Sequence, residues 1–375
     1  MGKEKTPQTL NHPRYVSNGV LGTGTYGHVL RCIDQQTGEV VAVKVSHKES
    51  AYRRSALNEA SILKTLNLSP NVLRMRETFE HEGRIHIACD MLHINLYELM
   101  RQRKFAITPL GQCREIGSII LKALGEVHAA GFMHCDVKPE NVMMRSKHSE
   151  TDCCLIDFGA IRRFHENQYY DIQSLWYRAP EVIAGVPYTT AIDIWSVGCM
   201  LYELHTGNPL FAGNDPQEQI NLIIDLVGQP SQESRTTGKN SYSLRFTGSS
   251  SRTPKFLEDS IVGADPLEIE MFADVLYQML SPDESQRYTV ADCLKHPFFS
   301  GAEKWNGPTS QRMAFLRNQS MSGITDSSSA LNSPEWRRAQ PIFDEEDDSP
   351  GMSTTGPYGA GSSQTVYQAP ANWTL

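Results

Sequence analysis

Two short segments near the middle of the chain carry side chains that could activate a hydroxyl group and hold a divalent metal ion. Residues 134–141 read HCDVKPEN, and residues 157–159 read DFG. Asp136 could act as a base beside a hydroxyl, with Asn141 five residues later as a neutral metal ligand. Asp157 follows an apolar stretch and adds a charged oxygen ligand of the kind that Mg²⁺ prefers. The combination predicts a metal-assisted phosphoryl-transfer site.

A glycine-rich segment near the N-terminus could bind phosphate groups. Residues 22–29 read GTGTYGHV, a spacing in which missing side chains let backbone N–H groups approach phosphates. The glycines alone would also fit an ordinary hairpin turn or a dinucleotide site. A dinucleotide site requires a helix directly after the glycines, whereas residues 29–32 continue as a strand. A nucleoside triphosphate is therefore the favoured ligand.

Lys44 ends the apolar strand at residues 41–44 and needs anionic partners. Burying a lysine is costly unless anions meet it, so the position requires a carboxylate and a phosphate. Glu59, on the next predicted helix, is the natural carboxylate. Taken singly, either residue would more often be an exposed surface charge.

The chain offers two regions of different secondary structure to position these residues. Residues 14–92 show strands near 20–21, 29–30 and 40–45, and one helix at 55–67 with Leu57, Ile62, Leu63 and Leu66 on its apolar face. Residues 93–300 are mainly helical, with an apolar repeat from Ile116 to Val127 and helices near 191–206, 215–228, 267–280 and 288–296. The 375 residues are long enough for two such cores.

Three segments differ from this pattern. Residues 1–13 are polar and are expected to be flexible. Residues 231–256 carry five bases against one acid and many Ser and Thr, which predicts a solvated basic insert loop. Residues 301–375 are rich in Ser, Thr, Gly and Pro, which predicts a mostly disordered tail.

Composition excludes several classes of protein. The net charge of −8 argues against general nucleic-acid binding. No apolar run reaches the roughly 18 residues that a membrane span requires. The eight cysteines form no C-x-x-C pair, so neither a disulfide framework nor a zinc site is indicated. We expect a monomer in a reducing compartment, in the cytoplasm, the nucleus or both.

The ordered set of motifs resembles the eukaryotic protein kinases over residues 14–300. Within them, the chain is most similar to the dual-specificity tyrosine-regulated kinase (DYRK) family of the CMGC group. The similarity rests on HCD at 134–136, IQS at 172–174, YRAPE at 177–181, GVPY at 185–188, AIDIWS at 191–196 and HTGNPLF at 205–211. It implies an α+β, bilobal kinase fold, with a small β-rich N-lobe (14–92) that has one main helix and a larger, mostly helical C-lobe (93–300).

The resemblance also implies roles for single residues. Lys44 would pair with Glu59 and hold the phosphates of ATP, and Asp136 would orient the substrate hydroxyl. Lys138 would meet the transferred phosphate, while Asn141 and Asp157 would bind Mg²⁺. The implied ATP-binding residues are Leu21, Gly22, Thr23, Gly24, Thr25, Tyr26, Gly27, His28, Val29, Ala42, Lys44, Glu59, Asp90, Met91, Leu92 and Met143. His134 would pack with Leu63 and Phe158 rather than act as a base, and Glu181 would form a buried ion pair with Arg287.

The activation segment departs from the family pattern. The family's activating Tyr-x-Tyr is replaced here by Tyr169, Tyr170 and Asp171. One interpretation is that Asp171 provides a permanent anion for Arg178, so that no tyrosine phosphate is needed. The other is that Asp171 is a solvated loop residue and that Tyr169 or Tyr170 is phosphorylated.

We expect an active Ser/Thr kinase that uses ATP and Mg²⁺, modifies protein substrates at sites followed by proline, and autophosphorylates on tyrosine. Alternatives are a pseudokinase scaffold, which binds partners without catalysis, and a kinase of the neighbouring homeodomain-interacting or Clk-like families. The five residues Lys44, Glu59, Asp136, Asn141 and Asp157 occur together, which argues against the scaffold.

Overall fold

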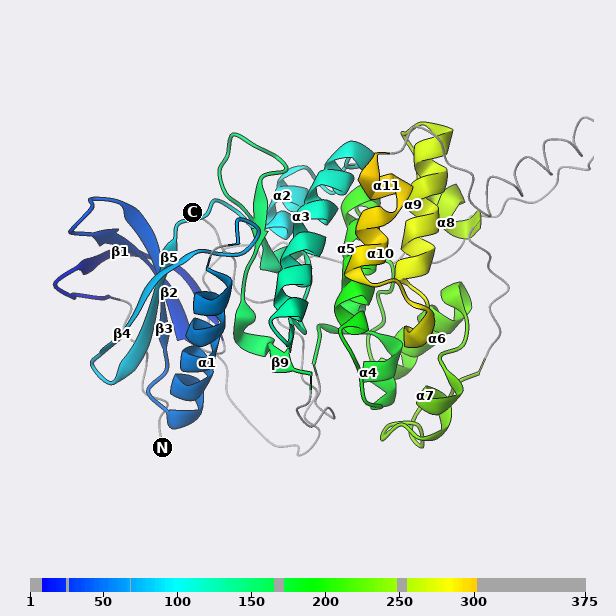
Figure 1. Ribbon diagram of the computed structural model, residues 1–375, viewed down its shortest axis with the longest axis horizontal. Coiled ribbons are helices and arrows are strands. Elements are labelled where there is room, and N and C mark those ends of the chain that lie inside the picture. The colour runs from blue at the N-terminus through cyan, green and yellow to red at the C-terminus, as the bar shows by residue number, and fades with distance from the viewer. Residues whose placement is uncertain (1–8, 25–26, 68, 165–171, 248–254, 302–375) are drawn as a thin grey trace, which may run out of the picture. The chain divides into compact units, whose positions relative to one another are not determined.

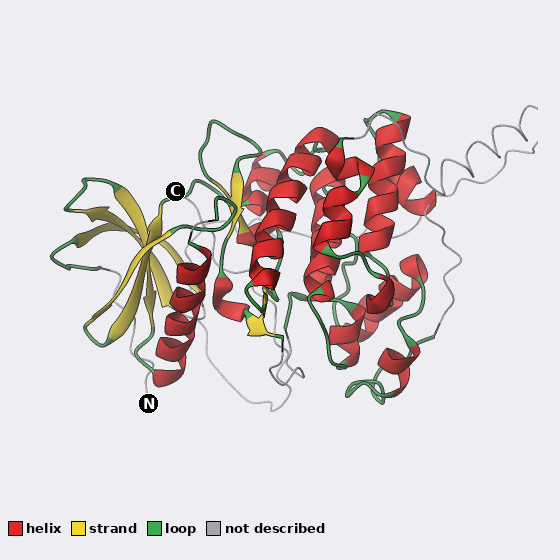
Figure 2. Cartoon of the chain, in the orientation of Figure 1, coloured by secondary structure: helices red, strands yellow, loops and turns green. Residues whose placement is uncertain are grey.

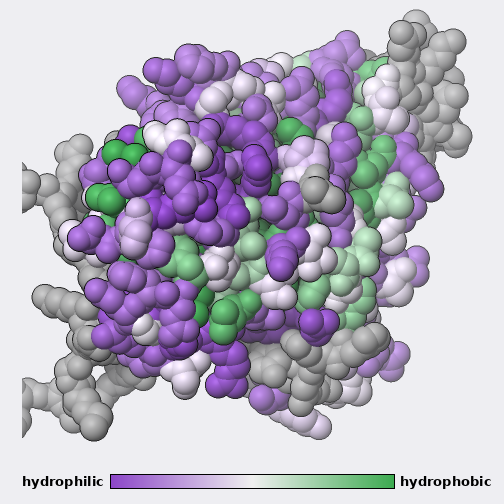
Figure 3. Space-filling view, turned by 60° about the vertical axis from the view of Figure 1, so that its left-hand side comes forward, coloured by the Kyte–Doolittle hydropathy of each residue, from purple (hydrophilic) through white to green (hydrophobic). Residues whose placement is uncertain are grey.

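The computed structural model describes residues 9–24, 27–67, 69–164, 172–247 and 255–301. All of them belong to one of the two units into which the chain divides. None of the helices within these ranges is long and apolar enough to span a membrane. Hydrophilic residues predominate on the face shown in Figure 3.

The N-lobe is a five-stranded antiparallel sheet with one helix against it (Figure 1). The strand order is β1-β2-β3-β5-β4, with β1 at Tyr15–Gly24, β2 at Gly27–Asp34, β3 at Val40–Ser46, β4 at Met75–His81 and β5 at Arg84–Asp90. In β3 the side chains alternate between the two faces of the sheet. Val41, Val43 and Val45 are buried on one face, so Ala42 and Lys44 lie on the other. The valine-rich strand thereby carries Lys44 on the opposite face from its apolar core.

The helix of this lobe, α1 at Ser50–Leu66, begins earlier than the apolar pattern predicts. Its buried face includes Ala56, Glu59, Ile62 and Leu63, whereas Leu57 is 49% exposed. The expectation that Leu57 belongs to the apolar face is therefore wrong. Leu57 and Leu63 are six positions apart in the sequence, which places the two side chains about 120° apart at 3.6 residues per turn.

The C-lobe is mainly helical (Figure 2). Its helices are α2 (Leu96–Gln102), α3 (Leu110–Ala129), α4 (Pro180–Ala184), α5 (Ala191–Thr206), α6 (Pro216–Val227), α7 (Gln232–Thr236), α8 (Lys255–Ser260), α9 (Pro266–Met279), α10 (Val290–Lys295) and α11 (Pro297–Ser300). Its short strands are β6 (Phe132–Met133), β7 (Val142–Met144), β8 (Cys153–Leu155) and β9 (Arg162–Arg163). Short 3-10 helices occur at Pro139–Asn141, Phe158–Ala160, Leu175–Tyr177 and Glu284–Gln286. Helix α5 is buried along almost its whole length, so it forms the centre of this lobe.

Part of the segment expected to be flexible at the N-terminus is ordered. The backbone N–H of Leu10 donates to the hydroxyl of Ser17, and the N–H of Ser17 donates to the carbonyl of Leu10. The side chain of Leu10 is buried with Tyr15 and Leu30. The expectation for residues 1–13 is thus wrong at Leu10, because an apolar side chain there completes the core beneath β1 and β2.

The basic segment 231–256 is also more structured than a solvated loop over its described residues 231–247. It contains α7, and Lys239 and Asn240 donate backbone N–H groups to the carbonyls of Gly185 and Ala184. The side chain of Asn240 donates to the carbonyl of Ile183. The last carbonyls of a helix lack partners within it. This segment therefore packs against α4 because it supplies donors to the end of that helix.

Candidate active site

Lys44 forms ion pairs with two carboxylates that come from different parts of the chain. Its Nζ lies 2.8 Å from Oε1 and from Oε2 of Glu59, and 3.2 Å from Oδ1 of Asp157. Glu59 projects from the buried face of α1, and Asp157 follows β8. Burial opposes the charge of Lys44, but the two carboxylates outweigh it and hold the pKa of Lys44 above its ordinary value. The attraction of Lys44 in turn lowers the pKa of Asp157.

Asp136 is the centre of a second group of polar side chains. Its Oδ1 accepts hydrogen bonds from the backbone N–H and the hydroxyl of Ser174, at 3.2 and 2.9 Å. Its Oδ2 lies 2.9 Å from Nζ of Lys138 and 3.1 Å from Nδ2 of Asn141. Lys138 also donates to the hydroxyl of Ser174 at 2.9 Å. The structure thus brings Asp136, Lys138 and Asn141 together, and it adds Ser174, whose role the sequence analysis missed.

The loop that carries Asp136 is fixed by Asp193 of α5. The backbone N–H groups of His134 and Cys135 donate to the two carboxylate oxygens of Asp193, both at 2.9 Å. Cys135 has a φ of 67°, a conformation that costs energy in a residue with a side chain. The two hydrogen bonds stabilise this conformation. The sequence motifs do not predict this role, although Asp193 is a charged residue between the apolar residues Ile192 and Ile194 of the helix.

His134 is a packing residue. It is buried, its ring lies 5.2 Å from the ring of Phe158, and its Nε2 is 3.1 Å from the carbonyl oxygen of Ile156. Leu63 and Phe158 belong to the same buried cluster. The contacts agree with the packing role that the resemblance implies and leave Asp136 as the candidate base.

The residues implied to contact the nucleotide lie on adjacent strands. Leu21, Gly22, Thr23 and Gly24 end β1, and Gly27, His28 and Val29 begin β2. A side chain at Gly27 would place its Cβ 1.8 Å from the carbonyl oxygen of Val45, so this position requires glycine. In the sheet Val29 pairs with Lys44, and Ala42 with Cys89. Thr25 and Tyr26 lie outside the described residues.

Residues 90–92 connect the two lobes. Asp90 ends β5 and pairs with Val41 of β3. Leu92 packs with Met143 of β7 in a small buried cluster. The backbone N–H of His93 donates a hydrogen bond to the carbonyl of Met144, with an N···O distance of 2.8 Å. The structure thus brings Leu92 together with Met143 and places Asp90 and Met91 on the same connection, whereas adenine binding by these residues stays a prediction.

The described part of the activation segment is tied to the C-lobe by Gln173. Its φ is 63°, and its buried side chain donates to the carbonyl of Ile192 and the hydroxyl of Ser196. Arg178 donates to the carbonyl oxygen of Gln173. Glu181 forms the buried ion pair with Arg287 that the resemblance implies, at 2.6 and 3.0 Å. The remaining residues of interest, Tyr169, Tyr170 and Asp171, lie outside the described residues.

Asn141 and Asp157 fit a magnesium ion by their chemistry. Asn141 uses its Nδ2 to reach Asp136, and its Oδ1 forms no hydrogen bond with any described residue. Asp157 uses Oδ1 for Lys44 and for the N–H of Gly159, while its Oδ2 forms no hydrogen bond with any described residue. Two oxygens, one neutral and one charged, are therefore available, and Mg²⁺ binds such oxygen ligands.

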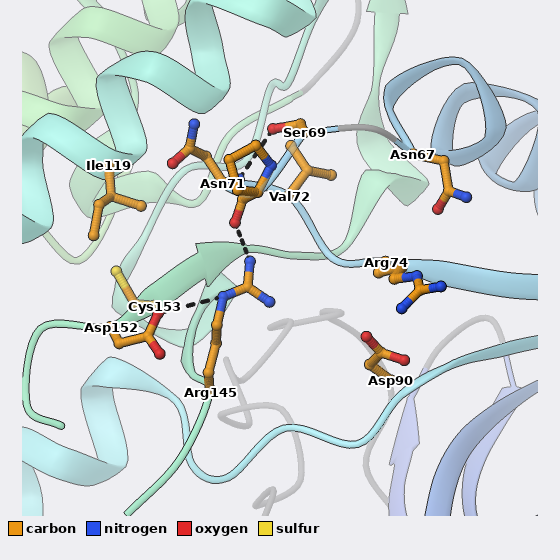
Figure 4. Close-up of a pocket in the computed structure, with 11 residues that line it drawn as sticks. Asn67, Ser69, Asn71, Val72, Arg74, Asp90, Ile119, Arg145, Asp152 and Cys153 are labelled. Carbon is orange, nitrogen blue, oxygen red and sulfur yellow. Dashed lines mark hydrogen bonds and ion pairs between the residues drawn. The ribbon is translucent and has the colours of Figure 1, made fainter. Parts of the chain in front are cut away.

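A cavity of about 450 Å³ lies apart from these residues (Figure 4). Its wall is formed by residues of the connection between α1 and β4, by Asp90, by Ile119 of α3, and by Arg145 and Asp152. Arg145 donates to the carbonyl of Pro70 and pairs with Asp152 (Figure 4). Since Lys44, Asp136 and Asp157 do not line it, this cavity is not the site described above.

Comparison with known proteins agrees with the site. The protein kinase domain family matches residues 15–299. Dual specificity tyrosine-phosphorylation-regulated kinase 3 of Mus musculus is 34% identical over 317 residues, which cover 76% of this chain and 54% of that protein. Dual specificity protein kinase YAK1 of Saccharomyces cerevisiae is 37% identical over 234 residues, which cover 61% of this chain and 29% of that protein. Serine/threonine-protein kinase ppk15 of Schizosaccharomyces pombe is 33% identical over 334 residues, which cover 77% of this chain and 62% of that protein.

The chain spans about half the length of the mouse relative. The family match covers most of the chain, and the sheet with one helix followed by a helical lobe is the bilobal α+β fold that the resemblance implies. The expected fold class and the resemblance to the DYRK kinases are thereby confirmed. The chain belongs to the protein kinase family.

Proposed function

We propose that this chain is an ATP-dependent protein kinase that phosphorylates Ser and Thr residues of proteins. The observation that carries the proposal is the contact of Lys44 with both Glu59 and Asp157. It joins the proposed phosphate-binding lysine of the N-lobe to the proposed metal-binding carboxylate of the C-lobe. The names of the relatives, which are dual-specificity and Ser/Thr protein kinases, support it.

In the proposed reaction the N-lobe holds the nucleotide. The glycine-rich turn between β1 and β2 offers backbone N–H groups to the phosphates. Lys44, kept charged by its two carboxylates, binds the phosphates as well. Mg²⁺, held by Asn141 and Asp157, would neutralise charge on the β- and γ-phosphates.

The C-lobe acts on the other substrate. Asp136 orients the hydroxyl of the protein substrate and accepts its proton, while the neighbouring Lys138 compensates the charge on the transferred phosphoryl group. Burial opposes the charge of Lys138, but Asp136 and Glu140 outweigh it and raise its pKa, so the side chain is protonated at neutral pH. Positioning and charge compensation supply the catalysis, since phosphoryl transfer needs little covalent chemistry from the protein.

We further propose that the kinase prefers Ser or Thr followed by proline. Arg178 already occupies the carbonyl oxygen of Gln173, next to Ser174 and Asp136. A residue with a backbone N–H at the position after the phosphoacceptor finds no acceptor there and leaves its donor unsatisfied. Proline has no backbone N–H, so its binding leaves no hydrogen-bond donor unsatisfied and avoids this energetic cost.

The proposal extends to regulation and context. Asp171 provides a permanent anion for Arg178, or else Tyr169 or Tyr170 is autophosphorylated. The kinase domain has its N-lobe at 14–92 and its C-lobe at 93–300, and it acts as a monomer on protein substrates in the cytoplasm, the nucleus or both. The absence of a candidate membrane span among the described helices is compatible with these locations.

Purified protein with labelled ATP and a degenerate peptide array tests activity and preference together. We expect transfer to Ser and Thr peptides with proline at the next position. A pseudokinase scaffold would transfer nothing, and the joint presence of Lys44, Glu59 and Asp136 at bonding distances from their partners argues against it. Transfer that ignores the following residue would reject the proline preference alone.

A further inference from the structure

Strand β4 contains an irregularity at Arg76. Met75 pairs with Cys89 of β5, and Glu77 pairs with Ala88, so β4 advances two residues where β5 advances one. Arg76 is therefore the extra residue of a β-bulge. Bulges bend a strand and redirect a side chain, and they are over-represented next to active sites.

The bulge directs Arg76 at the connection between the lobes. Its Nε donates to Oδ1 of Asp90 at 2.7 Å, and its Nη1 donates to Oε2 of Glu39 at 2.5 Å. Glu39 directly precedes β3, so Arg76 joins three separate pieces of the N-lobe. Both contacts are charge-assisted, which makes them stronger than neutral hydrogen bonds.

The ion pairs around Arg76 favour the charged forms of Arg76 and Glu39. Burial opposes the charge of Arg76, but the two carboxylates outweigh it and raise the pKa of its guanidinium. The hydrogen bond from Arg76 in turn lowers the pKa of Glu39. The side chains of Arg76 and Asp90 are 20% and 25% exposed, so solvent screens their pairing only in part.

Asp90 begins the short connection that carries Met91 and Leu92. Its backbone N–H donates to the carbonyl of Arg74, and the connection is fixed again where residue 93 donates to Met144. Between these two anchors, the orientation of the backbone depends on how Asp90 is held. Among the described residues, Arg76 forms the ion pair with its carboxylate.

We propose that Arg76 is a positioning residue for the nucleotide. By fixing Asp90, it sets the backbone of residues 90–92 in the orientation that binds adenine. The inference rests on the proposed function, because it takes these residues to be the adenine-binding hinge. It implies that Arg76 contributes to nucleotide affinity and has no part in the chemical step.

The test compares full-length wild type with Arg76→Ala, Arg76→Lys and Asp90→Asn. Arg54→Ala is the matched control, because Arg54 lies on α1, is exposed and forms no ion pair with any described residue. The readouts are kcat, KM for ATP and for a peptide, and the Kd of a non-hydrolysable ATP analogue measured by calorimetry. Arg76→Ala and Asp90→Asn should raise KM for ATP and the Kd roughly three- to tenfold. Arg76→Lys should restore part of the loss, and Arg54→Ala should match wild type.

Under the proposal, kcat and the peptide KM stay within about twofold of wild type in all variants. An unchanged Kd in both Arg76→Ala and Asp90→Asn would overturn it. So would a fall in kcat without a change in the Kd, or an equal loss of affinity in Arg54→Ala. If wild type binds the analogue but transfers no phosphate, the proposed function fails while the Kd comparison still decides the role of Arg76.

Discussion

Arg178 donates two hydrogen bonds, of 3.2 and 2.8 Å, to the backbone carbonyl oxygen of Gln173. Gln173 adopts a left-handed conformation, and its side chain is bonded to Ile192, Ser196 and Ala179. The strained backbone of Gln173 is thus stabilised by the hydrogen bonds of its own side chain and by those from Arg178 to its carbonyl. Its carbonyl is directed at Arg178 and is already satisfied when a substrate arrives.

This geometry predicts a measurable preference for proline. A peptide with proline after the phosphoacceptor should exceed its alanine counterpart in kcat/KM by about tenfold, the scale of one unsatisfied donor. Arg178→Met should reduce that ratio, because the carbonyl becomes available to the alanine N–H. Arg235→Met, at an exposed position of α7, is the control and should leave the ratio unchanged. A ratio that Arg178→Met does not alter would contradict the explanation.

Lys44→Met is expected to remove most phosphoryl transfer. The substitution deletes the proposed phosphate contact and leaves Glu59 without its cation. The initial rate should fall by about 10²-fold or more, or ~2.7 kcal/mol, while circular dichroism shows a folded protein. Lys64→Met, at an exposed position of α1, serves as the control and should keep the wild-type rate. A wild-type rate in Lys44→Met would remove Lys44 from the site.

Arg287→Met should destabilise the C-lobe. It leaves the carboxylate of Glu181, which is 2% exposed, buried without a counter-ion. Losing one partner of a buried pair costs about 3–5 kcal/mol. Urea denaturation followed by tryptophan fluorescence measures the change in the free energy of unfolding. A loss below about 1 kcal/mol would mean that water reaches Glu181.

Glu203 should make stability depend on pH. It accepts a hydrogen bond from the hydroxyl of Tyr177, and burial raises the pKa of its carboxyl to about 7 from an ordinary value of 4.5. Between these two values the folded protein keeps a proton that the unfolded chain releases. The free energy of unfolding must therefore fall as the pH rises through this window, by up to about 3 kcal/mol.

Glu203→Gln isolates this effect, because glutamine can still accept from Tyr177 but does not titrate. Subtracting the variant's free energy of unfolding from that of wild type should give a difference that declines with rising pH across the window. Glu284, whose pKa burial also raises to about 7, titrates in both proteins and cancels. A difference that stays constant with pH would show that Glu203 is ionised in the folded state throughout.

The features that the sequence predicted well depend on local pattern. The helix at 191–206 is observed at those residues, and α6 and α9 lie within one residue of the predicted bounds. α6 and α9 each begin with an aspartate cap followed by proline, signals that act over a few residues. The pairing of Lys44 with Glu59 followed from the resemblance and from the need of a buried lysine for a carboxylate.

The features that the sequence did not predict depend on contacts between residues far apart in the chain. Asp193 supports the backbone of Cys135 across 58 residues, and Arg76 holds Asp90 only because a bulge redirects its side chain. Leu57 is exposed because the part of the helix that packs inward includes Glu59, a polar residue that a hydrophobic pattern ignores. These relationships depend on tertiary packing, which sequence periodicity does not report.

The proposed function requires that Asp136 acts on the protein substrate. The direct test measures transfer from γ-labelled ATP to a Ser-Pro peptide by wild type and by Asp136→Asn, with the Kd of an ATP analogue measured for both. We predict transfer by wild type, a loss of about 10²-fold or more in Asp136→Asn, and an analogue Kd that stays within about twofold. Equal transfer by the two proteins would remove Asp136 from catalysis, and no transfer by a wild type that binds the analogue would reject the proposed kinase activity.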